Sequence, residues 1–152
     1  MNLLTGEFRN TLDEKGRLSL PARLRNGLAG NAFVLTRGLD ACLWLFTPET
    51  WEEFARKITS VGSPFDPNAR LVQRRLLAPS QEVEVDKLGR ISVPQSLRDY
   101  AGLSRECTIL GMASYIEIWD SQAYSRYLEG TEADFAMATA AFTDIRLGAG
   151  VP

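Results

Sequence analysis

Histidine is absent from the 152 residues of the chain. A Ser-His-Asp triad, a Cys-His pair, a zinc site with histidine ligands and a histidine general acid are therefore impossible. The two cysteines, Cys42 and Cys107, lie far apart in apolar segments and fit no CxxC spacing. We expect both to be inert thiols in the core. These absences favour a protein that is not an enzyme and that binds no metal or cofactor.

Long apolar runs are also missing. The longest, Ala41–Phe46, is far shorter than the ~20 residues that a membrane-spanning helix needs. The N-terminal residues show neither the basic nor the apolar region of a secretory signal. Hydrophobic residues make up 45% and charged residues 24% of the chain, as in an ordinary globular protein. We expect a compact cytoplasmic protein with its own core and no membrane partner.

Positive charge is scarce overall but unevenly distributed. The formal net charge is −2, yet residues 1–105 sum to +3 and residues 106–152 to −5. Screening by salt confines the field of a charged patch to ~8–10 Å, so a basic patch can attract a polyanion on an acidic chain. The segment 9–25 holds five basic residues against two acidic ones, and the basic ones are Arg9, Lys15, Arg17, Arg23 and Arg25.

An internal repeat organises the sequence. The segment Asp13–Pro21, DEKGRLSLP, recurs 73 residues later as Asp86–Pro94, DKLGRISVP. The same register continues for about forty residues, with apolar positions exchanged for other apolar residues. Such a pattern indicates two copies of one folding unit. We expect the chain to divide into a first unit (5–58), a linker with an arginine-rich helix (59–79), a second unit (80–128) and a C-terminal helix and tail (129–152).

Both copies predict the same local structure. A strand with alternating polar residues leads into a tight turn that ends at Gly16 or Gly89, where glycine supplies a positive φ. Asp13 and Asp86 are expected to hold the N–H groups of this turn or the arginine that follows it. A short strand, a short helix that starts at a proline, two more strands and an amphipathic helix complete each copy. The fold class predicted from this order is α+β.

Two further helices are expected outside the copies. Residues 68–78 carry Arg70, Arg74 and Arg75, which are suited to DNA, to a neighbouring subunit or simply to solvent. Residues 131–147 are alanine-rich, with apolar side chains at helical spacing. The sequence does not decide whether this acidic C-terminal part packs on its own core or on a neighbour.

Several conspicuous residues are assigned to structure. Trp44, Trp51 and Trp119 fall on apolar stripes, away from the basic clusters, and we expect them in the core. Arg25 and Arg98 are expected at the ends of short helices, either solvated or paired with a neighbouring carboxylate.

The duplicated motif resembles the MraZ family of bacterial transcriptional regulators, and the resemblance covers nearly the whole chain. It implies two swapped-hairpin units of the SpoVT-AbrB type that form a pseudo-symmetric β-barrel core with peripheral helices. It also implies closed homo-oligomeric rings that bind direct repeats of double-stranded DNA in the promoter of their own division and cell-wall operon. Binding would repress that operon at the nucleoid without a small-molecule ligand.

The resemblance places the DNA contact at Arg17, with Lys15 in the same turn. An arginine at the junction of a turn and a strand can donate two hydrogen bonds to guanine or to a phosphate. The copies differ, because residues 9–25 sum to +3 whereas residues 82–98 sum to zero. We expect the first copy to face DNA and the second mainly to complete the core and the ring. The predicted DNA-binding residues are Arg17, Lys15, Arg9, Arg23, Arg90 and Lys87.

Two other functions are compatible with the same features. An antitoxin of the MazE/AbrB type would cover a toxin with a disordered C-terminal tail. The predicted helix at 131–147 and the second complete unit argue against that alternative. A ring-forming interaction scaffold would use the acidic C-terminal part to hold partner proteins.

Overall fold

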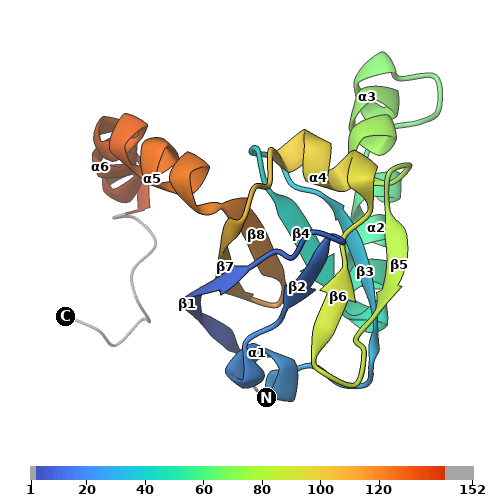
Figure 1. Ribbon diagram of the computed structural model, residues 1–152. Helices are drawn as coiled ribbons and strands as arrows, with labels where there is room; N and C mark the ends of the chain where they lie inside the picture. The colour runs from blue at the N-terminus through green and yellow to red at the C-terminus, as the bar shows by residue number, and fades with distance from the viewer. Residues whose placement is uncertain (1–2, 143–152) are drawn as a thin grey trace, which may run out of the picture.

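The computed structural model describes residues 3–142 and shows an α+β fold (Figure 1). Its strands are β1 (Leu4–Thr11), β2 (Arg17–Ser19), β3 (Ala32–Arg37), β4 (Leu43–Phe46), β5 (Gln81–Glu84), β6 (Arg90–Ser92), β7 (Glu106–Ala113) and β8 (Ile116–Asp120). Its helices are α1 (Ala22–Gly27), α2 (Pro48–Ser60), α3 (Pro67–Leu76), α4 (Gln95–Ala101), α5 (Ser121–Gly130) and α6 (Glu132–Ala141). None of the helices within 3–142 has both the length and the apolar composition that a membrane crossing requires.

The two sequence repeats are interleaved in space. Strand β1 of the first repeat pairs with β7 of the second, β5 pairs with β3, and β2 pairs with β6, all antiparallel. The six-stranded sheet has the order β1-β7-β8-β4-β3-β5. Because β1 to β4 correspond to β5 to β8, this order is the same when read from either edge. The duplication seen in the sequence is therefore a pseudo-twofold symmetry of the fold, and each repeat completes the other's sheet.

The β-barrel core that the resemblance implies is not confirmed by the strands of residues 3–142, which form two sheets. Strands β2 and β6 form a separate two-stranded sheet, and β1 and β5 remain the edges of the larger sheet. The physical reason is the shortness of β2 and β6, which have three residues each and pair with each other. A single bridge, Leu12 to Leu18, joins β2 to the end of β1.

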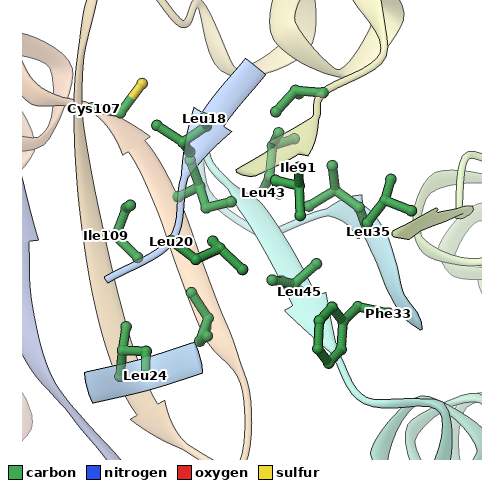
Figure 2. Packing of buried hydrophobic residues seen from close by; sticks show 14 of the residues in the cluster. Leu18, Leu20, Leu24, Phe33, Leu35, Leu43, Leu45, Ile91, Cys107 and Ile109 are labelled. Carbon is green, nitrogen blue, oxygen red and sulfur yellow. The ribbon is translucent and has the colours of Figure 1, made fainter. Parts of the chain in front are cut away.

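The centre of the larger sheet is buried on both faces, as the alternation along β4 shows. Leu43 and Leu45 belong to an aliphatic core, whereas Trp44 and Phe46 belong to an aromatic cluster. The aliphatic core fills the space between the sheet and the β2–β6 pair, and Figure 2 shows Leu18 of β2 close to Leu43. Complete burial of one such side chain contributes roughly 1.5–3 kcal/mol, so the core anchors both short strands.

The aromatic cluster lies on the opposite face of the sheet, under α2 and α5. Trp44 and Trp119 are buried, and Trp51 of α2 is half-buried against Phe46, so all three tryptophans pack as expected. The carboxylate of Glu117 accepts a hydrogen bond from each of the two buried indoles, at 2.9 Å in both cases. This cluster therefore fixes α2 and α5 to the sheet.

The cysteines lie where the sequence places them. Cys107 is fully buried in the aliphatic core and Cys42 in the aromatic cluster, and neither forms a disulfide. Burial raises the pKa of the Cys107 thiol to about 12 and also raises that of Cys42. Both thiols are therefore protonated and unreactive at neutral pH.

Helix starts follow the capping residues of the sequence. Thr47 and Asp66 accept backbone hydrogen bonds at the starts of α2 and α3, and Asp120 does the same for α5. Each of these helices therefore begins where a side-chain oxygen can satisfy an otherwise unpaired N–H group. The predicted C-terminal helix over 131–147 is present as α6, and residues 143–147 lie outside the described part of the chain.

Candidate nucleic-acid interface

The β2–β6 pair presents one polar face and one apolar face. In its register Arg17 lies opposite Ser92, Leu18 opposite Ile91, and Ser19 opposite Arg90. Side chains alternate across a strand, so Leu18 and Ile91, both fully buried, point into the core. The outer face of this two-stranded ribbon, hereafter the arginine ribbon, therefore consists of Arg17, Ser19, Arg90 and Ser92.

An aspartate holds each ribbon arginine in place. The Oδ1 atom of Asp13 accepts hydrogen bonds from the backbone N–H groups of Lys15 and Arg17, at 2.9 and 2.8 Å. Its Oδ2 atom accepts one from the side-chain Nε of Arg17 at 2.7 Å, and the side chain of Arg17 stays 33% exposed. Asp86 makes the same three bonds in the second repeat, including one of 2.9 Å to the Nε of Arg90. The arginines are thus oriented before any ligand binds.

These hydrogen bonds stabilise the charged form of the aspartates. The backbone N–H of Arg17 is the main reason why the pKa of Asp13 lies below its ordinary value of 3.8. The backbone N–H of Arg90 has the same effect on the pKa of Asp86. A lowered pKa in the folded state stabilises the fold above the unfolded value, and this contribution is lost as the pH falls through the folded value. Both turns are therefore fully formed at neutral pH.

Each turn is also packed against an arginine of the other repeat. Gly16 and Gly89 both have φ near +80°. A Cβ atom added at Gly16 would lie 2.6 Å from the Cζ of Arg98, and one at Gly89 would clash with the Nη1 of Arg25. Both arginines lie in the last turns of short helices, α1 and α4, as expected, but each packs on a backbone turn instead of standing free in solvent or pairing with a carboxylate of the described residues. They are half-buried because the interleaving of the repeats places them on a backbone turn.

Replacing Gly16 by alanine is expected to destabilise the protein more than replacing Gly30. Both glycines have φ near +80°, but a methyl group at Gly30 would meet nothing within 4 Å. The left-handed backbone alone costs about 1–2 kcal/mol for a non-glycine residue. Turning the flexible end of the Arg98 side chain aside adds about 0.5–1.5 kcal/mol for Gly16→Ala. Urea unfolding of both variants measures the difference.

An Arg98→Ala background provides the control for that comparison. There the excess loss at Gly16 should disappear, because the displaced group is gone. Equal losses at Gly16 and Gly30 in the wild-type background would contradict the packing of Arg98 on the turn.

Arg105 lies next to the first turn, and the repeat pattern of the sequence does not predict this position. A hollow of about 580 Å³ is lined by residues 11–15 and 17 together with Ser104 and Arg105. The backbone N–H of Leu12 donates to the carbonyl of Arg105 at 2.7 Å, which holds the two segments together. Arg105 is exposed, and the equivalent position of the first repeat is Ala32. The signal in the sequence is this lone basic residue just before β7.

The six predicted DNA-binding residues do not all lie together. Arg17 and Arg90 are on the arginine ribbon, and Lys15 and Lys87 are exposed in the turns that lead into it. Two lie elsewhere: Arg9 is on β1 beside Arg126 of α5, and Arg23 of α1 donates to the Oγ1 of Thr5 at 3.2 Å.

The two ends of the arginine ribbon differ in the arrangement of their charges. Lys15, Arg105 and Glu14 lie around Arg17, whereas the second turn has Lys87 and the exposed, uncharged Leu88. The net charge of the two ends is the same, but the first end includes an exposed cation, Arg105, that comes from outside the turn.

Comparisons with known proteins point to a single family. The family model of the MraZ protein, described as antitoxin-like, matches residues 3–75 and again residues 76–145. The transcriptional regulator MraZ of Treponema denticola is 49% identical over 142 residues, which is 93% of this chain and 99% of that protein. The transcriptional regulator MraZ of Treponema pallidum is 46% identical over 96% of this chain and 98% of its own length. That of Halothermothrix orenii is 39% identical over 94% and 99%, respectively.

Proposed function

The chain belongs to the MraZ family of transcriptional regulators, and from this membership we propose that it regulates transcription by binding double-stranded DNA through the arginine ribbon. The observation that carries the proposal is the outer face of that ribbon, on which Arg17 and Arg90 are held by their aspartates. The family is one of regulators and is not a class of enzymes.

The shape of the ribbon suits the major groove of DNA. That groove admits a two-stranded β-ribbon, and it presents the N7 and O6 acceptors of guanine. Asp13 uses only the Nε of Arg17, which leaves the terminal nitrogens of the guanidinium for a base edge or a phosphate. Ser19 and Ser92 are small enough to let the ribbon approach the bases closely. Lys15 and Arg105 lie beside the ribbon, where they would contact phosphates.

We assign the main DNA contact to the first repeat. Residues 9–25 sum to +3 whereas residues 82–98 sum to zero, and Arg105 lines the hollow beside Arg17. In this proposal the second repeat supplies the strand that pairs with β2 and the arginine that packs on the first turn.

Several copies would act together on the DNA. We propose that residues 5–58 and 80–128 are units of the SpoVT-AbrB type and that the chains form a homo-oligomeric ring. The ring would bind direct repeats in the promoter of the chain's own division and cell-wall operon, at the nucleoid in the cytoplasm, and repress it. Linked sites raise the effective concentration of each further contact, so individually weak contacts on an acidic protein suffice.

An antitoxin is the second candidate, because the matching family model is described as antitoxin-like. Such a protein would bind a toxin through its C-terminal segment. The described part of that segment, α6, is a regular helix joined directly to α5.

Titration with the DNA upstream of the gene tests the proposed function. The logarithm of the binding constant should fall linearly with the logarithm of the salt concentration, with a slope of about −0.9 per neutralised phosphate. A duplex of the same length with a scrambled sequence is the control and should bind far more weakly at every salt concentration. Equal affinity for both duplexes would contradict sequence-specific regulation.

A further inference from the structure

Helix α6 is apolar on every side and yet exposed along its whole length. Its sequence, EADFAMATAA, has polar residues only near its start and at Thr139, and all ten residues are solvent-exposed. Phe135 is 70% and Met137 74% exposed, and Phe142 just beyond the helix is 61% exposed. A helix that is hydrophobic all round is normally buried. The described fold therefore leaves the apolar side chains of Phe135, Met137 and Phe142 without the burial that such a composition normally brings.

The position of α6 keeps it away from the chain's own core. Helix α5 is fixed to the sheet through Tyr124 and Tyr127, whose rings lie 5.2 and 4.9 Å from that of Trp119. Helix α6 continues beyond α5 and projects from the body of the molecule, on the opposite side from α3 (Figure 1). Helices α5 and α6 therefore form an arm, defined as residues 121–142.

An apolar groove lies on that opposite side, between α2 and α3. It has a volume of about 310 Å³, and Ile58, Val61, Ala69 and Val72 form most of its lining. Phe65, which precedes α3 in the sequence, is 90% exposed. The groove can accept an aromatic or methionine side chain.

The arm and helix α3, which borders the groove, carry opposite charges, while Lys57 and Asp66 in the lining of the groove offset each other. Helix α3 carries Arg70, Arg74 and Arg75 and no acidic residue, and Arg74 and Arg75 are exposed. The arm carries three carboxylates against one arginine, and the carboxylates are Glu129, Glu132 and Asp134. Contact between two arms would bring these carboxylates together, so charge favours arm to groove over arm to arm.

We propose that α6 of one copy docks into the α2–α3 groove of the next copy. The contact joins two different surfaces, so it is head-to-tail and closes into a ring when the rotation between copies permits. It deepens the proposed function by assigning the interface of the homo-oligomer. It also gives the arginines of α3 a role at a subunit contact instead of on DNA.

Two variants separate the halves of this contact. The double substitution Phe135→Ser and Met137→Ser removes two apolar side chains from the arm and leaves the groove intact. Val72→Glu places a charge in the lining of the groove and leaves the arm intact. All three residues are well exposed, so the fold should tolerate the changes. Size-exclusion chromatography with light scattering, without DNA, measures the mass of the full chain.

The wild type is expected as an assembly of several copies, and each variant as a monomer of 16.9 kDa. A mixture of the two variants keeps one intact arm and one intact groove, so it should form a dimer of twice that mass and nothing larger. Leu88→Glu, an exposed substitution outside both surfaces, should assemble like the wild type.

Three results would overturn the proposed contact. They are a monomeric wild type, a variant that still assembles fully, and two monomeric variants that fail to combine when mixed. Titration of the same variants with a duplex that holds a single repeat keeps the proposed function separate. If the variants do not assemble but still bind that duplex, the proposed DNA regulation stands. If the wild type assembles but does not bind the duplex, the proposed DNA regulation is refuted and the proposed contact stands.

Discussion

Arg17→Ala is expected to weaken binding to the upstream DNA by about 5- to 150-fold for each engaged ribbon. This range corresponds to the ~1–3 kcal/mol of a bidentate contact between arginine and guanine. The loss should be larger than for Arg90→Ala, because Arg105 lines the hollow beside the first arginine, whereas the residue equivalent to Arg105, Ala32, carries no charge. Fluorescence titration at matched salt measures both variants.

The control for these variants is Arg56→Ala. Arg56 lies on the exposed face of α2, paired with Glu52 at 2.6 Å, and should have no effect on DNA binding. Equal losses for Arg17→Ala and Arg90→Ala, with both proteins folded, would contradict the division of labour between the repeats. If both variants bind the upstream DNA with the affinity of the wild type, the arginine ribbon is not part of the DNA interface.

Leu18→Ala should have the largest effect on stability, a loss of about 2–5 kcal/mol in the free energy of unfolding. Leu18 is completely buried and is the register partner of Ile91, so its side chain joins the ribbon to the aliphatic core (Figure 2). Ile91→Ala should cost a similar amount, and the two losses should not add, because the residues are in contact across the ribbon. Urea unfolding followed by circular dichroism measures these values.

Leu39→Ala is the matched control, because Leu39 is 71% exposed. Its effect should stay within about 0.5 kcal/mol. A loss at Leu18 as small as that at Leu39 would show that the ribbon is not anchored through its apolar face.

The local structure of each repeat could be predicted from the sequence because it depends on local chemistry. A glycine with positive φ follows an aspartate that binds backbone N–H groups, and both features lie within five residues. The helix starts at Thr47, Asp66 and Asp120 depend on equally local chemistry, since a capping side chain accepts a hydrogen bond from the first turn of the helix that follows it.

The pairing between the repeats could not be predicted in the same way. Nothing in the segment around Arg17 specifies that β2 pairs with β6. The strands are 73 residues apart, and the sequence of a three-residue strand does not identify the strand with which it pairs. The packing of Arg98 on Gly16 and the approach of Arg105 to the first turn follow from that pairing. The role of Arg17 stays a prediction from the resemblance, and the three-dimensional fold shows which residues lie around it.

The most direct test of the account asks whether the arginine ribbon enters the major groove. Ser92→Cys places a thiol on the exposed face of the ribbon, opposite Arg17, and the two native thiols are too deeply buried to compete. The DNA carries a thiol tethered to a base in the major groove of the upstream repeat, and Ser63→Cys, in the exposed linker, is the control. The account predicts a disulfide crosslink to DNA for Ser92→Cys and none for Ser63→Cys. No crosslink at Ser92→Cys under conditions where the complex forms would contradict it.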